Sequence, residues 1–181
     1  MDKTIIRDIK SRFFALRNGV VADRLRSCGS PYKIIFGLLI PQVENIAASL
    51  TPSTEIADAL WDNRSTRESR LLATMVHPLE AMTTEKALRW GQEADTIELA
   101  DVLCFRLLRN LDHAEDLAYS LLESRKYVSL RLLMNLLILR RLSDVERARL
   151  VAANHLNDED VAVKRVCNQL IDEIDWISQS N

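Results

Sequence analysis

The chain has 181 residues, of which 48% are hydrophobic and 28% charged, a balance typical of a folded domain rather than of a disordered segment. This length suits a single domain that covers residues 1–181. The odd number of cysteines, three, and the lack of an apolar leader or spanning run argue against a disulfide-stapled secreted domain and a membrane protein. We therefore expect a cytoplasmic protein whose thiols stay reduced.

Helices account for most of the predicted structure, because glycine and proline, which sheet proteins need in their turns, number only four each. Several helix starts carry a hydroxyl or acidic residue three positions before a glutamate, where it can cap a free backbone N–H. These starts are marked by Ser65 with Glu68, Asp95 with Glu98, Asp112 with Glu115, Ser143 with Glu146, and Thr51 followed by Pro52. We expect helices at residues 4–17, 20–27, 41–50, 52–61, 66–76, 84–92, 96–109, 113–124, 126–141, 144–155 and 158–177.

The apolar run at residues 34–40 is the best candidate for a β-strand, but it has no obvious partner strand. We interpret it as a buried loop that leads into the helix at 41–50. Many short helices on brief linkers, without a long heptad seam, favour stacked antiparallel helix pairs. We therefore predict an all-α fold built as an α-solenoid, or superhelix, with an irregular helical bundle as the alternative.

Basic residues are concentrated in two segments, although the net charge is only −2. Residues 1–33 carry eight basic and three acidic side chains, and residues 124–150 carry seven and two, a surplus of five in each. The remaining segments are acidic. The two basic segments could meet on one face and attract phosphate, or they could be ordinary solvated helix faces.

The helix expected at 126–141 is apolar on nearly every side, which is typical of a buried helix. Tyr127, Arg131 and Asn135 interrupt it at intervals of four residues and therefore share one stripe. An arginine cannot lose its proton, so a buried Arg131 needs a carboxylate or a charged ligand.

Asp101 is the natural partner for this arginine. It is flanked by apolar residues, and its helical neighbours Ile97 and Phe105 are apolar too, whereas Arg106 and Arg109 mark the solvated face of the same helix. An acid on a dry stripe can pair with Arg131 as a buried strut, or it can face a cleft and act on a ligand. Periodicity leaves both interpretations open.

Three stretches carry a resemblance to a known family. They are YK, GLLIP and IA within residues 32–47, ALWD, RE and LA within residues 59–73, and the segment 95–101. In this order they resemble the DNA alkylation-repair glycosylases built from HEAT-like repeats, over roughly residues 20–170. The resemblance implies a right-handed superhelix of HEAT-like helix pairs and the excision of positively charged alkylated purines.

The resemblance also implies roles for individual residues. Asp101 matches the aspartate that stabilises the developing oxocarbenium sugar or positions water, and Arg131 falls near an arginine that contacts the DNA backbone. Two tryptophans of the family are missing, because Ile97 stands four residues before the aspartate and Asn168 follows Lys164 in the last helix. Their aromatic faces would hold a cationic lesion, at about 0.5 to 2 kcal/mol for each contact.

Two functions therefore stand side by side. The first is a duplex-DNA-binding protein that could also act as a monofunctional N-glycosylase and excise lesions such as 3-methyladenine or 7-methylguanine. The second is a catalytically silent helical-repeat module that binds a protein or structured DNA.

We expect a monomer with double-stranded DNA as its partner, no cofactor, no metal and no membrane contact. Trp61 and Trp90 are interpreted as core residues rather than as replacement aromatic walls. The predicted site consists of Asp101 as the catalytic residue and Arg131, Tyr127, Asn135, Lys33 and Lys164 as DNA-binding residues.

Overall fold

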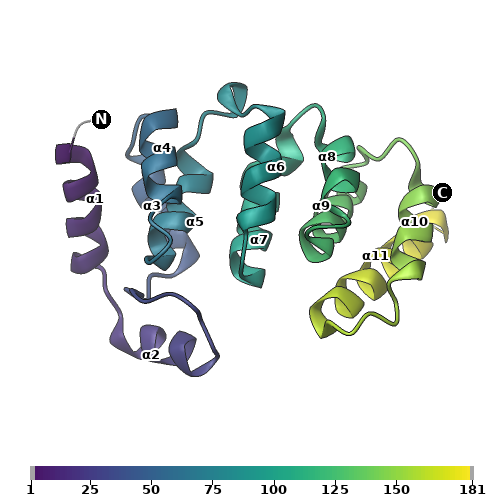
Figure 1. The fold of residues 1–181 in the computed structure, drawn as a ribbon, viewed down its shortest axis with the longest axis horizontal. Coiled ribbons are helices and arrows are strands. Elements are labelled where there is room, and N and C mark those ends of the chain that lie inside the picture. Colours follow the sequence, from purple (N-terminus) through teal and green to yellow (C-terminus); the bar gives the residue numbers. More distant parts are fainter. Residues whose placement is uncertain (1–2, 180–181) are drawn as a thin grey trace. The chain divides into compact units, whose positions relative to one another are not determined.

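The computed structural model of the chain describes residues 3–179, and within them the fold is all helical, with no strand. The α-helices are α1 (Lys3–Ala15), α2 (Gly19–Ser27), α3 (Ile40–Ala48), α4 (Thr54–Trp61), α5 (Arg67–Val76), α6 (Thr84–Glu93), α7 (Ile97–Arg106), α8 (Ala114–Leu121), α9 (Lys126–Ile138), α10 (Val145–Asn154) and α11 (Val161–Gln179) (Figure 1). Two short 3-10 helices, η1 (Leu79–Ala81) and η2 (Leu108–Asn110), follow α5 and α7. The all-α prediction is confirmed, and each predicted helix is present with its ends shifted by a few residues.

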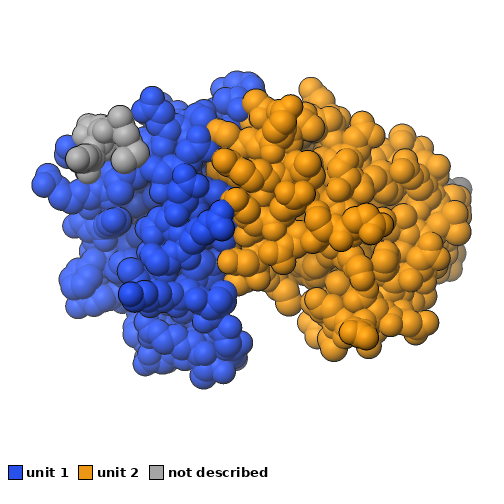
Figure 2. All heavy atoms as spheres, viewed as in Figure 1, with its two compact units in different colours: residues 1–81 blue, residues 82–181 orange. Residues whose placement is uncertain are grey.

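The chain divides into two compact units, residues 1–81 and residues 82–181 (Figure 2). In the first unit, α5 packs against both α3 and α4. Trp61, at the end of α4, is completely buried, and the guanidinium carbon of Arg70 lies 4.2 Å from its ring centroid. The prediction that Trp61 is a core residue is confirmed.

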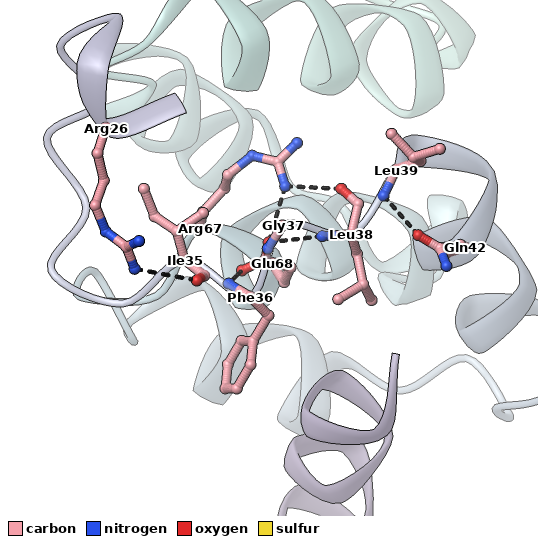
Figure 3. Close-up of polar contacts among 9 residues, drawn as sticks. All are labelled: Arg26, Ile35, Phe36, Gly37, Leu38, Leu39, Gln42, Arg67 and Glu68. Atoms are coloured by element: carbon pink, nitrogen blue, oxygen red, sulfur yellow. Dashed lines mark hydrogen bonds and ion pairs between the residues drawn. The ribbon is translucent and has the colours of Figure 1, made fainter. Parts of the chain in front are cut away.

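The run at 34–40 is a loop that leads into α3, as predicted, but its burial is partial: Ile35 and Leu38 are buried, whereas Ile34 and Leu39 are exposed. The carboxylate of Glu68 holds the loop in place (Figure 3). One oxygen of this fully buried carboxylate accepts the backbone N–H groups of Gly37 (2.9 Å) and Leu38 (3.3 Å), and the other accepts that of Phe36 (3.1 Å). Arg67 Nη1 lies 2.9 Å from the same carboxylate and donates to the carbonyl of Leu38 at 2.9 Å. Glu68 and Arg67 therefore supply several of the hydrogen-bond partners that a neighbouring strand would give to this loop.

Gly37 allows the start of α2 to approach this loop closely. Its φ is +78°, and a Cβ atom would lie 2.2 Å from the carbonyl oxygen of Asn18 and 2.8 Å from the amide nitrogen of Ala22. Any side chain would be strained in its backbone conformation and would also collide with backbone atoms. The Asn18 amide in turn donates to the Phe36 carbonyl at 2.8 Å, which ties α2 to the loop.

Helix capping differs from the predicted positions by one or two residues. The N-cap residues of α5, α7, α8, α10 and α4 are Thr66, Thr96, His113, Asp144 and Ser53, and not Ser65, Asp95, Asp112, Ser143 and Thr51. Thr96, Asp144 and Ser53 are extended, and the side chain of each accepts a backbone N–H of the first turn, whereas Thr66 and His113 make no side-chain cap hydrogen bond. The displaced glutamates make tertiary contacts instead: Glu68 binds the loop, and Glu115 accepts the backbone N–H of Ser143 at 2.9 Å.

In the second unit, α9 packs against α7, α8 and α11, while α6 packs on α8 and α10 on α11. The leucines of α9 are buried on several sides, which explains its uniformly apolar sequence. Trp90 of α6 is fully buried, which confirms it as a core residue. At Gly91 a Cβ atom would lie 2.7 Å from a methyl carbon of Leu121, so the small residue lets α6 and α8 pack closely.

The cysteines are unpaired; Cys104 and Cys167 are buried and Cys28 is exposed. Burial raises the pKa of Cys167 to about 11, so its thiol stays protonated and unreactive at neutral pH. The interpretation of these two buried cysteines as core thiols is confirmed. Among the helices described here, none combines the length and apolar character needed to cross a bilayer.

Candidate functional site

Three of the predicted side chains meet in the second unit. Asp101 projects from α7, and Tyr127 and Arg131 project from neighbouring turns of α9, which packs directly against α7. The Tyr127 hydroxyl donates a hydrogen bond of 2.9 Å to Oδ1 of Asp101. Arg131 Nε lies 2.9 Å from the same oxygen. The predicted pairing of the aspartate with the arginine is therefore confirmed.

The two contacts on Asp101 differ in kind. Tyr127 makes a directed hydrogen bond, whereas Nε of Arg131, although close enough for an ion pair, makes no hydrogen bond of normal geometry. The arginine thus acts mainly through its charge. Both partners lie at Oδ1, and no hydrogen bond within residues 3–179 reaches Oδ2 of Asp101, a side chain that is 35% exposed.

Neither member of the ion pair is buried, so of the two interpretations left open by the sequence the buried strut does not describe this pair. The exposed fraction of the side chain is 35% for Asp101 and 31% for Arg131. The apolar residues one turn to either side of the aspartate, Ile97 and Phe105, are themselves 53% and 44% exposed. The stripe that was predicted to be dry therefore faces solvent, and an ion pair this exposed contributes about 1 kcal/mol or less to stability.

Tyr127 stays a neutral hydrogen-bond donor over the physiological pH range. Burial of the ring, the negative charge of Asp101 and the hydrogen bond to it all raise the pKa of the Tyr127 hydroxyl well above its usual range. Behind this pair, burial also raises the pKa of the Cys104 thiol, whose Sγ lies 3.6 Å from the carbonyl oxygen of Val128. The only charged groups of this cluster at neutral pH are the carboxylate and the guanidinium.

The other predicted site residues do not join this cluster. Asn135 is 6% exposed, and its amide donates to the carbonyl oxygen of Arg131 one turn earlier at 2.8 Å. On α11, Asn168 is exposed and donates in the same way to the carbonyl of Lys164, at 2.8 Å. Lys33 is an exposed residue of the first unit. The DNA-binding role of these three polar positions, Asn135, Lys164 and Lys33, remains a prediction.

An aromatic and basic group beside Asp101 was not singled out from the sequence. The guanidinium carbon of Arg109 lies 3.7 Å from the ring centroid of Phe105, and that of Arg106 lies 5.1 Å from it. Arg141 donates to the carbonyl oxygens of Arg109 and Leu111. A signal for this group existed in the sequence, because Arg109 stands four positions after Phe105, the spacing at which helical side chains are neighbours.

Comparison with known proteins bears on the whole chain. A family described as DNA alkylation repair enzyme matches residues 9–176. No curated protein and no solved structure matches the chain. The family match begins in α1, ends in α11 and includes the α7–α9 pair that carries Asp101 and Arg131. The chain belongs to the DNA alkylation repair enzyme family.

Proposed function

We propose that the chain binds duplex DNA and hydrolyses the N-glycosidic bond of positively charged alkylated purines, with Asp101 as the catalytic residue. Membership of the DNA alkylation repair enzyme family supports a role in DNA repair. The observation that carries the catalytic part of the proposal is the half-exposed carboxylate of Asp101, fixed by Tyr127 and Arg131 at one oxygen and open at the other.

The chemistry requires little from the protein. A purine alkylated at N3 or N7 is already cationic, so it departs as a neutral base when the bond from C1′ to the purine nitrogen breaks and its electron pair stays on the base. Positive charge develops on the sugar at C1′, where a carboxylate stabilises it electrostatically. Water then adds its oxygen to C1′ and releases a proton to solvent or to Asp101. No general acid is needed to protonate the leaving group.

The geometry of the cluster suits this role. Arg131 attracts the carboxylate and Tyr127 limits its rotation, so the negative charge is held in position before the substrate arrives. Oδ2 is the atom available to the sugar or to the attacking water. Since Arg131 is itself partly exposed, its remaining N–H groups can reach a phosphate of the same strand.

For DNA binding we propose that residues 1–181 act as one domain and one monomer, with the helix pairs arranged as a HEAT-like α-solenoid whose basic concave face grips the duplex. The family match supports a single domain because it runs across both compact units. In this arrangement Lys33 and Lys164 supply phosphate contacts in addition to Arg131. A cytoplasmic location is part of the same proposal.

A catalytically silent binding module is the second candidate, and a specific observation favours it. Ile97 and Asn168 occupy the positions where the resemblance places two tryptophans, and both are exposed, so no aromatic wall exists at either position. A module of this kind would keep the fold and the DNA or protein contacts without base excision.

Base release separates the two candidates. Alkylated duplex DNA is incubated with the wild-type chain, with Asp101→Asn, and with Asp172→Asn, which changes an exposed aspartate of α11. We expect release of 7-methylguanine or 3-methyladenine by the wild type and the control, and a loss of at least tenfold in Asp101→Asn. Release by none of the three, combined with DNA binding, would leave the silent module as the function. Equal release by all three would remove Asp101 from the mechanism.

A further inference from the structure

Phe105 forms an exposed platform for two arginines one helical turn after Asp101. The ring is 44% exposed, and the guanidinium carbons of Arg109 and Arg106 lie 3.7 and 5.1 Å from its centroid. An aromatic face attracts a guanidinium and also restricts its rotation, so the arginine keeps its charge at one place on the surface. Because Arg109 covers the ring, Phe105 does not offer this face to a base.

The positive charges of Arg109 and of the neighbouring Arg141 are not neutralised by a carboxylate of the described residues. Within residues 3–179, neither Arg109 nor Arg141 forms an ion pair with a carboxylate. The Nε group of Arg109 is buried without a hydrogen-bond partner. Arg141 donates to the backbone carbonyl oxygens of Arg109 and Leu111, so its guanidinium is held against the backbone of Arg109 and keeps its charge. Two cations without a carboxylate partner on one short segment are suited to an anion with several acceptor oxygens.

The platform also lies in line with the acid. Asp101, Phe105 and Arg109 follow one another at intervals of four residues, so they occupy one stripe that begins on α7 and continues into η2. By the helical rise, the backbone of Arg109 is at most about 12 Å from that of Asp101. In a duplex whose damaged sugar sits at the aspartate, the phosphates within roughly three base-pair steps fall in this range.

We propose that Phe105, Arg109 and Arg141 form a phosphate-binding strip that holds the DNA backbone beside the nucleotide engaged by Asp101. The inference rests on the proposed duplex-DNA binding and adds the contact that sets the register of the duplex on α7. Arg109 supplies a planar fork for two phosphate oxygens, Phe105 fixes the direction of this fork, and Arg141 adds charge. The strip explains why a helix carrying the catalytic acid ends in arginines.

The test is a salt titration of duplex binding, with undamaged fluorescent 16-base-pair DNA as the probe. Log Kd is measured against log salt for the wild type, Arg109→Gln, Arg141→Gln, Phe105→Leu and the Phe105→Leu/Arg109→Gln double variant. The control is Arg147→Gln, because Arg147 stacks on Tyr119 at the same 3.7 Å but belongs to α10. Melting curves establish that each variant is folded.

We expect the salt slope to fall by about one for each lost arginine and to stay unchanged in the control. Phe105→Leu should weaken binding several-fold in the wild-type background and have a clearly smaller effect once Arg109 is replaced, since Arg109 is the arginine closer to the ring. Wild-type slopes in folded Arg109→Gln and Arg141→Gln would overturn the strip and leave the proposed function standing. Salt-independent binding by the wild type would overturn both.

Discussion

Replacement of Glu68 by glutamine should destabilise the first unit strongly. The carboxylate is 0% exposed, and its two oxygens accept three backbone N–H groups of the loop at 36–38 (Figure 3). Glutamine is nearly isosteric, so its carbonyl oxygen can keep the contacts with Gly37 and Leu38. Its amide nitrogen, however, replaces the oxygen that accepts from Phe36, and two N–H donors then face each other.

The magnitude follows from two losses. A hydrogen bond to a charged acceptor, here the one from Phe36, contributes about 1.5 to 3 kcal/mol. The guanidinium of Arg67, whose side chain is 4% exposed, also loses the adjacent carboxylate, and breaking a buried ion pair in this way costs about 3 to 5 kcal/mol. The two losses overlap, so we expect Glu68→Gln to lower the free energy of unfolding by about 3 to 5 kcal/mol and the melting temperature by about 10 °C.

Thermal and urea denaturation followed by circular dichroism at 222 nm measure this effect. The matched control is Glu80→Gln, which changes an exposed glutamate of the same unit and should alter stability by about 0.5 kcal/mol or less. If Glu68→Gln melts within 2 °C of the wild type while the control behaves as expected, the carboxylate does not hold the loop, and the argument from its buried contacts is wrong.

Three further predictions concern packing and charge. Gly37→Ala should destabilise the chain by about 2 kcal/mol or more in urea denaturation, because its φ is +78° and a Cβ atom would lie 2.2 Å from a backbone oxygen. Asp101→Asn should lower the raised pKa of Tyr127, since a negative charge and a strong acceptor disappear. Carbon-13 NMR of labelled tyrosine measures this pKa, and an unchanged pKa in the variant would contradict the prediction. Lys126→Gln should raise the pKa of Asp158, which the lysine hydrogen bond now lowers, as followed by carboxyl NMR. Because the pKa of Asp158 is lower in the folded state, its carboxylate stabilises the fold at pH values above its unfolded pKa of about 4, and this stabilisation is lost as the pH falls. The variant has less of this stabilisation to lose, so its stability should depend less on pH in the acidic range.

Most of the fold was predictable because helical periodicity is a local property. The apolar sequence at 126–141 predicted a buried helix, and α9 is the helix on which α7, α8 and α11 pack. The loop at 34–40 was predictable for a different reason, since no second β-rich segment exists to pair with it. The predicted superhelix depends on how successive helix pairs are rotated, which no local pattern specifies, and it remains a proposal.

The capping pairs show where local reasoning fails. At the starts of α7 and α10, two adjacent polar residues are chemically able to cap, and which of them adopts the extended conformation depends on the chain that precedes the helix. Glu68 illustrates the consequence: it stands at the spacing of a capping-box residue, but the loop at 36–38 offers it three N–H groups. A contact between residues more than thirty positions apart cannot be derived from spacing within one helix.

The sequence predicted which residues of the site pair with each other, but it did not predict how exposed they are. A charged residue on an apolar helix must find an opposite charge, so the pairing of Asp101 with Arg131 followed from physical chemistry alone. Burial did not follow, because an apolar neighbour such as Phe105 can serve an arginine on the surface as well as a core. The arginines on Phe105 were missed for a related reason. Arg109 was assigned to the solvated face of the helix, whereas its guanidinium lies on the ring of Phe105, one turn after Asp101.

The exposure of Asp101 has a consequence for the kind of substrate that the site can process. A neutral purine leaves slowly unless it is protonated, which requires a general acid of raised pKa in a dry pocket. Tyr127 cannot supply that proton, because its pKa is raised far above neutrality and its hydroxyl is committed to Asp101. A cationic purine needs only the negative charge of the carboxylate near C1′. If the proposed glycosylase function holds, the site selects its substrate by charge, and we expect base release from alkylated DNA but none from undamaged or uracil-containing DNA bound through the same phosphates.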